Sequence, residues 1–258
     1  MKTPPLPTES LRGRTALVTG ASRGIGAAIC ARLAQLGARV LLVGRSTDRL
    51  NEVAAQLSNR DLKHEVFTAD LTLPPDVARL ADEVQRRHPV VDILVNNAGV
   101  LPEAKRAERI SRQQWAAVIE LNLTSPWFLA CRVRELMPAS GGVVINVAST
   151  AAMYPSVGLA PYNVSKAGLV MLTQVLALEW ASAGIRVLTV APGKTNTDMV
   201  APIMAWTTKN DIAVNPLGRL GDPAEIADLV GFLCTDRADY LTGAVVPIDG
   251  GELLTSGR

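Results

Sequence analysis

The stretch TGASRGIG, residues 19–26, follows directly on the β-rich run TALVT at residues 15–19. Its glycines, Gly20, Gly24 and Gly26, suit a turn in which backbone N–H groups approach a phosphate. The inner fragment GASRG also fits G-x-S-x-G, the pattern of a serine nucleophile on a strand-to-helix turn. Both interpretations require a strand before the stretch and a helix after it. The stretch therefore predicts the first βα unit of an α/β fold.

The alternation of strand-like and helix-like segments continues along the chain. Strands are expected at residues 15–19, 39–43, 65–69, 92–96, 143–147, 186–191 and 244–248. Helices are expected at residues 24–36, 47–57, 74–87, 161–183 and 222–234, and two more at 111–136, broken near Asn122. Strict alternation predicts a single doubly wound Rossmann-type domain, with a seven-stranded parallel sheet flanked by helices on both faces.

Length and composition support one globular domain. The chain has 258 residues, 48% of them apolar, and a net charge of +2, which gives no reason to expect nucleic acid or an anionic membrane as a partner. Residues 1–11 hold three prolines and are expected to form an extended leader before a domain at 12–258. No apolar run approaches the roughly 18 residues of a membrane helix, and three dispersed cysteines do not form a disulfide framework. A cytoplasmic protein is expected.

The histidines decide between the two interpretations of GASRG. A hydrolase of this pattern needs a histidine late in the chain, after the nucleophile and the acid. The chain has two histidines, His64 and His88, and 170 residues follow the second. A nucleotide-binding loop is therefore favoured over a nucleophilic Ser22, and no metal site is expected.

Four motifs in order resemble the short-chain dehydrogenase/reductase family. They are TGASRGIG at 19–26, NNAG at 96–99, YNVSK at 162–166 and PG at 192–193. The resemblance covers the chain except its leader, and is nearest to the 3-oxoacyl-thioester reductases of acyl-carrier proteins. It implies an enzyme that transfers a hydride between a nicotinamide cofactor and a ketone or alcohol of small-molecule size.

The resemblance assigns catalytic roles to four residues. Tyr162 would donate the proton, Lys166 would hold the nicotinamide ribose, Ser149 would polarise the carbonyl, and Asn122 would hold a water in a proton relay. Tyr162 and Lys166 are four residues apart on an expected helix, so they share a face. A nearby ammonium would lower the tyrosine pKa from about 10.

Two arginines favour NADP(H) over NAD. The second expected strand ends in Gly44-Arg45, without the carboxylate that binds the 2′-hydroxyl of NAD. Arg45 and Arg23 suit the doubly charged 2′-phosphate of NADP(H). With them, the resemblance assigns to the cofactor site Gly20, Ser22, Gly24, Ile25, Gly26, Asp70, Leu71, Asn97, Ala98, Gly99, Tyr162, Lys166, Pro192, Gly193, Thr195 and Thr197.

The substrate stays open. Residues 199–215 have the composition of a lid or of a packed helix, and Lys194 stands where the family commonly has an apolar residue. An oxoacyl thioester competes with a cyclic alcohol, a steroid or a sugar, and Arg132 and Arg134 are candidate docking charges for an acidic carrier. A non-catalytic nucleotide-binding regulator on the same scaffold is a further alternative, which the presence of both Tyr162 and Lys166 disfavours. The helix at 161–183 is apolar around most of its circumference, so one face is expected to be buried in a partner. Because the family that the chain resembles usually assembles as tetramers through this helix, the helix at 123–136 and the C-terminal strand, the resemblance implies a homotetramer.

Overall fold

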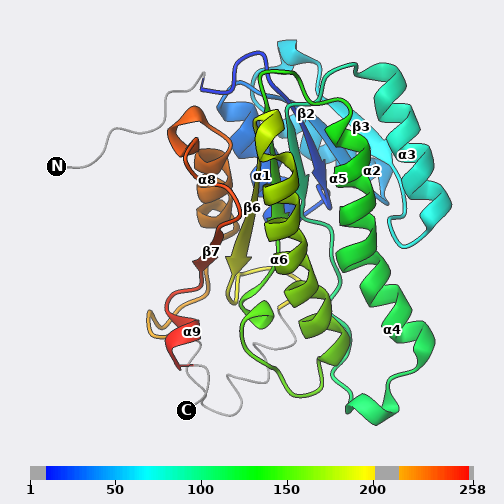
Figure 1. The fold of residues 1–258 in the computed structure, drawn as a ribbon, viewed down its shortest axis with the longest axis vertical. Helices are drawn as coiled ribbons and strands as arrows, with labels where there is room; N and C mark the ends of the chain where they lie inside the picture. The colour runs from blue at the N-terminus through cyan, green and yellow to red at the C-terminus, as the bar shows by residue number, and fades with distance from the viewer. Residues whose placement is uncertain (1–9, 201–214, 256–258) are drawn as a thin grey trace.

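Seven parallel strands form one sheet in the computed structural model, which describes residues 10–200 and 215–255 (Figure 1). The strand order is β3-β2-β1-β4-β5-β6-β7. The strands are β1 (Thr15–Thr19), β2 (Arg39–Gly44), β3 (Glu65–Thr68), β4 (Ile93–Asn96), β5 (Gly142–Val147), β6 (Ile185–Pro192) and β7 (Val245–Ile248). The predicted doubly wound sheet is confirmed, with its order reversing between β1 and β4.

Helices cover both faces of the sheet, as expected. They are α1 (Gly24–Gln35), α2 (Thr47–Gln56), α3 (Pro74–Arg87), α4 (Arg112–Ile119), α5 (Ser125–Arg134), α6 (Ala160–Trp180), α8 (Pro223–Leu233) and the short α9 (Glu252–Thr255). On β2, Leu42 belongs to the core on the side of α1 and α8, while Leu41 and Val43 belong to the core on the side of α3, α5 and α6. Alternate residues of each central strand thus enter opposite cores, which explains why these strands are apolar throughout.

Glycines end two helices where the sequence places them. After α1, Gly37 has φ +92, and the amide of Ala38 donates to Leu33 O at 3.0 Å. After α6, Gly184 has φ +69. A left-handed residue here turns the chain back into the next strand at little cost, because glycine has no Cβ.

The expected break near Asn122 is a wide turn inside a continuous helical path. Residues Glu120–Thr124 form a π-helical turn that joins α4 to α5. Asn122 lies in this turn and is fully buried. A π turn adds one residue to the helix without interrupting it.

The body of the domain includes Leu11, which the sequence assigned to the leader. Leu11 is buried in the core, and its amide donates to Leu36 O at 2.7 Å. No helix in the described part of the chain is long and apolar enough to cross a membrane.

Candidate active site

The glycine-rich stretch turns sharply at the carboxyl end of β1. Gly20 and Gly24 have φ of +66 and +54. A Cβ on Gly26 would lie 2.1 Å from Gly20 O, so the first turn of α1 packs directly against the loop. This packing requires glycine and brings the start of α1 to the edge of the sheet.

The N-terminus of α1 suits an anion. No side chain caps it, and its first turn carries no acidic residue. The first amides of a helix have no partner within the helix, and the helix dipole favours negative charge there. Gly20, Ser22, Arg23, Gly24, Ile25 and Gly26 therefore form a loop and helix start that fit a pyrophosphate.

The NNAG motif holds the glycine loop from the neighbouring strand. Asn97 Nδ2 donates to Thr19 O at 2.9 Å and to Gly20 O at 3.3 Å. The amides of Asn97 and Ala98 both donate to Thr19 Oγ1 at 3.0 Å. The motif therefore fixes the shape of the loop, a role that its chain position alone did not reveal.

Three predicted catalytic side chains meet at the carboxyl end of β5. Ser149 follows β5 and lies close enough to Tyr162 to lower the pKa of that residue. Lys166, one turn further along α6, is buried and donates from Nζ to Val147 O at 2.9 Å. Its Nζ lies 5.9 Å from the centre of the Tyr162 ring.

Burial dominates the electrostatics of this cluster. Burial raises the pKa of Tyr162, and the hydrogen bond from Ser149 opposes the rise. Burial lowers the pKa of Lys166 to about 8. In the protein by itself the pKa of Tyr162 is thus shifted upward, because desolvation of the phenolate is the largest cause, while the lowering expected from Lys166 together with the nicotinamide stays a prediction for the protein with bound cofactor. Tyr162 is held in its protonated form.

Asn122 reaches the same cluster from the π turn. Its Nδ2 donates to Val100 O and to Ser165 Oγ, both at 3.1 Å, and its Oδ1 accepts from the Val100 amide at 2.9 Å. A Cβ on Gly99 would lie 3.3 Å from Asn122 Oδ1 and 3.5 Å from Lys166 Nζ. Asn122 and Lys166 therefore both lie beside Gly99, close to each other.

The expected 2′-phosphate residues lie at the ends of β1 and β2. Arg45 is exposed, and no ion pair is recorded for it within residues 10–200 and 215–255. Arg23 instead pairs with Asp198 at 2.9 Å, and both side chains are exposed. Arg45 fits a phosphate as it stands, whereas Arg23 would have to exchange its partner.

Asp70 and Leu71 follow β3 at the same edge. Asp70 Oδ1 accepts from the amide of Thr72 at 2.9 Å and from its hydroxyl at 2.7 Å. Leu71 is buried, and its carbonyl accepts from Ser125 Oγ at 2.6 Å. The Asp70 carboxylate thus has a fixed position beyond the end of β3.

The loop after β6 completes the edge. Pro192 ends the strand, and Thr195 Oγ1 donates to Gly193 O at 3.1 Å. Thr197 Oγ1 donates to Thr195 O at 3.3 Å, and a Cβ on Gly24 would lie 3.2 Å from the Thr197 methyl. The loop therefore returns to the glycine-rich stretch. The expected lid at 199–215 lies almost wholly outside the described residues.

The histidines lie at the opposite edge of the sheet from Ser22. His64 precedes β3 and His88 lies between α3 and β4, so both are at the amino ends of strands. His64 Nδ1 accepts from the Val40 amide at 3.1 Å, and His88 is buried near Glu65. Neither can serve Ser22 as a base, which argues against the hydrolase.

Lys194 has a partner that the sequence did not suggest. It forms an ion pair with Glu252, whose side chain is almost fully buried. Tyr154 OH also donates to Glu252 Oε1, at 3.1 Å. The sequence analysis did not include Glu252 and Tyr154 in the site. The feature that could have indicated Glu252 is Lys194, because a lysine at a usually apolar position needs a negative partner.

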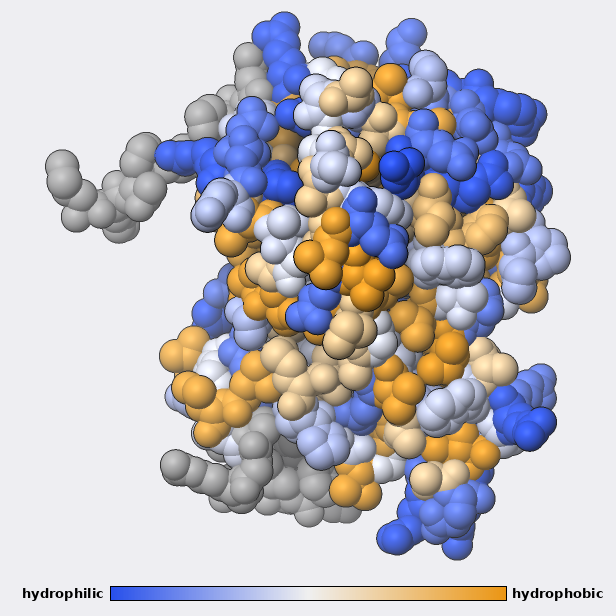
Figure 2. Space-filling view, viewed as in Figure 1, coloured by the Kyte–Doolittle hydropathy of each residue, from blue (hydrophilic) through white to orange (hydrophobic). Residues whose placement is uncertain are grey.

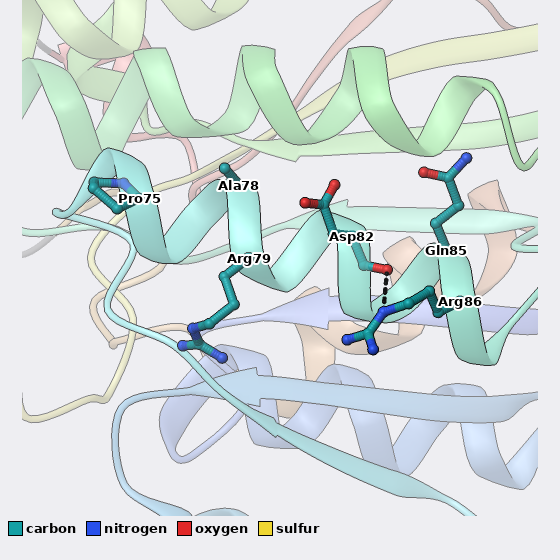
Figure 3. A pocket seen from close by; sticks show the side chains of 6 residues that line it. All are labelled: Pro75, Ala78, Arg79, Asp82, Gln85 and Arg86. Atoms are coloured by element: carbon teal, nitrogen blue, oxygen red, sulfur yellow. Dashed lines mark hydrogen bonds between the residues drawn. The ribbon is translucent and has the colours of Figure 1, made fainter.

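A surface depression on α3 lies away from this site. Figure 3 shows its lining, and none of the predicted site residues is among Pro75, Ala78, Arg79, Asp82, Gln85 and Arg86. Arg132 from α5 donates to Asp82 Oδ1 at 2.7 Å and to Gln85 Oε1 at 3.0 Å. This candidate docking charge is therefore paired within the protein.

The family described as Enoyl-(Acyl carrier protein) reductase matches residues 20–252. The chain is 35% identical to 3-oxoacyl-[acyl-carrier-protein] reductase FabG of Aquifex aeolicus, over 93% of this chain and 98% of the relative. It is 38% identical to D-threitol dehydrogenase of Mycolicibacterium smegmatis, over 93% of each chain.

A solved structure agrees in fold and length. It is a putative NAD(P) dependent gluconate 5-dehydrogenase from Beutenbergia cavernae with bound NADP, at low occupancy. It superimposes with a TM-score of 0.87 at 36% identity, covering 96% of this chain and 100% of that one. The match of fold, motif order and full-length relatives confirms the resemblance drawn from the sequence: the chain belongs to the short-chain dehydrogenase/reductase family.

Proposed function

We propose that the protein is an NADPH-dependent carbonyl reductase that protonates the developing alkoxide from Tyr162. The observation that carries the proposal is the cluster of Ser149, Tyr162 and Lys166 at the carboxyl end of β5, where Lys166 Nζ donates to Val147 O at 2.9 Å and lies 5.9 Å from the centre of the Tyr162 ring. When bound, NADPH would supply the hydride to the carbonyl carbon. The sixteen positions assigned by resemblance, with Arg23 and Arg45, would hold it along the carboxyl edge of the sheet.

The protonation states suit reduction. A carbonyl oxygen that gains a hydride needs a proton, and the raised pKa of Tyr162 keeps that proton on its hydroxyl at neutral pH. Ser149 would orient the carbonyl oxygen beside the tyrosine. Lys166, with a pKa of about 8, is mostly an ammonium at pH 7 and would bind the nicotinamide ribose.

Two substrate classes have specific support. The Aquifex aeolicus relative is named a 3-oxoacyl-[acyl-carrier-protein] reductase, which favours a 3-oxoacyl thioester. D-threitol dehydrogenase and the gluconate 5-dehydrogenase structure favour a hydroxylated small molecule. Because Arg132 is paired with Asp82, docking of an acidic carrier through this arginine has less support than a small substrate.

The proposal extends to assembly and location. We infer a homotetramer, supported by the apolar stripe of exposed α6 side chains Val164, Met171, Val175 and Leu178. Figure 2 shows apolar side chains gathered over the middle of the face of the molecule on which α6 lies in Figure 1. A cytoplasmic location is supported by the three free cysteines, two of them buried thiols.

Substrate turnover by a tyrosine variant tests the function. The protein is titrated with NADPH and NADH by tryptophan quenching, and NADPH oxidation is then followed with acetoacetyl-CoA, ethyl acetoacetate and cyclohexanone. D-threitol with NADP⁺ tests the reverse direction. Tyr162→Phe should lower kcat about 10²- to 10⁴-fold and change NADPH binding far less, because Lys166 and the other cofactor positions are kept.

The exposed Tyr240 offers a matched control. Tyr240→Phe should turn over substrate at the rate of the unmodified protein. Equal turnover by the Tyr162→Phe variant would refute the mechanism, and binding of neither cofactor would refute the enzyme.

A further inference from the structure

The carboxylate of Glu252, near the C-terminus, is buried beside the loops that follow β5 and β6 in the candidate active site. Glu252 begins α9, and 5% of its surface is exposed. Figure 1 shows α9 at the end of the molecule toward which the arrows of β6 and β7 point. The carboxylate therefore lies at the edge of the sheet where the site residues gather.

Glu252 joins the loop after β5 to the loop after β6. Its Oε2 accepts from Thr150 Oγ1 at 3.4 Å and from the Lys194 amide at 3.3 Å. Thr150 is adjacent to Ser149. A Cβ on Gly193 would lie 2.7 Å from the same oxygen, so the carboxylate packs directly against that α-carbon.

The other carboxylate oxygen faces two polar side chains. Oε1 accepts from Tyr154 OH at 3.1 Å and pairs with Lys194 Nζ. Burying a carboxylate is costly unless charge and hydrogen bonds compensate it, and Lys194 supplies the charge. The Lys194 ammonium is thus directed to Glu252, which gives its presence at a usually apolar position a physical reason.

Tyr154 belongs to the segment between Ser149 and Tyr162, which carries the Glu252 cluster toward α6. Its charge is a minor cause of the raised pKa of Tyr162. Asn163, next to Tyr162, donates from Nδ2 to Ala151 O at 2.6 Å and to Tyr154 O at 2.9 Å. The segment is therefore held from α6 on one side and from Glu252 on the other.

We propose that Glu252 is a positioning residue for carbonyl reduction: through Thr150, Tyr154 and Lys194 it fixes the two loops between which the carbonyl is held. This inference rests on the proposed function. The contacts of Glu252 described above go to Thr150, Tyr154 and Lys194, so it would act on the reaction by setting where Ser149 and Gly193 stand. Its loss should lower kcat more than it changes cofactor binding.

Four variants test the inference. Glu252→Leu removes both acceptor oxygens at similar volume, and Glu252→Gln keeps one acceptor without the charge. Tyr154→Phe removes a single hydroxyl. Leu254→Ala changes an exposed side chain on the same short helix and is the control. For each, kcat and KM are measured with ethyl acetoacetate, the Kd of NADPH by tryptophan quenching, and amide exchange by mass spectrometry.

The expected results form a graded series. Glu252→Leu should lower kcat at least tenfold, Glu252→Gln and Tyr154→Phe less, and Leu254→Ala less than twofold, all with the Kd of NADPH within twofold. Amide exchange of residues 150–156 should rise in Glu252→Leu and stay unchanged in the control. The kcat of Glu252→Leu within twofold of the unmodified protein would overturn the inference and leave the reductase standing.

The exchange measurement separates the two proposals. If the unmodified protein reduces no ketone, the proposed function fails by itself. Unchanged exchange of residues 150–156 in the Glu252→Leu variant would then overturn the positioning as well, whereas increased exchange would support the loop contacts that the inference requires.

Discussion

Lys166 carries a charge that folding penalises. Burial lowers its pKa from 10.5 to about 8, so the unfolded chain binds the proton more tightly than the folded protein. Below pH 8 Lys166 is charged in both states, so burial of the charge lowers the free energy of unfolding by its full amount. This loss of stability becomes smaller as the pH rises from 8 to 10.5, and it vanishes above that. Lys166→Met should therefore increase the free energy of unfolding at pH 7 by about 2 kcal/mol, allowing for the lost hydrogen bond to Val147 O.

Urea unfolding at pH 7 and pH 9.5 checks this expectation. The gain should shrink at the higher pH, while turnover is lost at both. Lys105→Met, at a lysine near the surface, should show no such trend. A gain that stays equal at the two pH values would contradict the assigned cause.

Arg45 should decide cofactor selectivity. Its guanidinium is exposed at the end of β2, whereas Arg23 already has Asp198 as a partner. Arg45→Ala should weaken NADPH binding about tenfold, or about 1.4 kcal/mol, and leave NADH binding unchanged. Arg49→Ala, four residues along, is the control. If fluorescence titrations showed that Arg45→Ala weakens the binding of NADPH and NADH equally, Arg45 would not contact the 2′-phosphate.

A substitution at Asp198 tests the role of Arg23, and it is expected to strengthen NADPH binding where Arg45→Ala weakens it. Asp198→Asn keeps the size of the side chain but removes the charge that Arg23 pairs with. If Arg23 has to exchange Asp198 for the 2′-phosphate, this variant should bind NADPH more tightly, by up to about threefold since exposed ion pairs are weak. The affinity for NADH should not change. Weaker binding of NADPH would show that Asp198 helps to position Arg23.

At the scale of elements, the π turn depends on one side chain. Asn122 is fully buried and bonds both backbone groups of Val100 and the hydroxyl of Ser165. Asn122→Ala removes three hydrogen bonds of a fully buried side chain and leaves a cavity in the π turn, which should cost about 3 kcal/mol of unfolding free energy. Ser165→Ala removes one of the three contacts and should cost less than half as much. Thermal unfolding of both variants measures the difference, and equal costs would contradict it.

The elements themselves were predictable because their signals are local. A parallel strand covered on both faces is apolar throughout, as VLLV at residues 40–43 is, and a glycine stop such as Gly37 is visible in the sequence. The nature of the break at Asn122 was not predictable. A kink, a cap and a π turn share one sequence signal, and the hydrogen bonds of Asn122 with Val100 and Ser165 decide among them.

Pairings across the chain were also hidden from the sequence. Lys194 and Glu252 are 58 positions apart, and Arg23 and Asp198 are 175 apart. Each pair forms because parallel strands bring their following loops to one edge, and the sequence does not say which loops then touch. The pKa of Tyr162 went the opposite way from expectation for a similar reason, since burial depends on the whole packed edge.

At the scale of the whole molecule, α6 is too apolar for a surface helix. One side packs in the core through Leu169, Thr173, Leu176 and Trp180. The other side exposes Val164, Met171, Val175 and Leu178, spaced so that they form one stripe. Trp115 on α4 and Trp127 on α5 are also partly exposed. Contiguous apolar surface of this kind favours burial against another protein chain.

Leu178 is the side chain through which the stripe can be tested, because 83% of it is exposed and its replacement does not disturb the core. A second copy of the chain is the proposed partner, and a charge in a buried apolar contact is costly. Leu178→Glu should therefore reduce the mass measured by light scattering at micromolar concentration from a tetramer to a dimer or monomer. Leu73→Glu, at an exposed leucine before α3, should leave the tetramer intact.

A monomeric unmodified protein, or a tetrameric Leu178→Glu variant with an unchanged melting temperature, would show that α6 does not carry the contact. A dissociated variant that still binds NADPH would separate assembly from cofactor binding, as expected if each chain carries a complete set of the predicted cofactor residues.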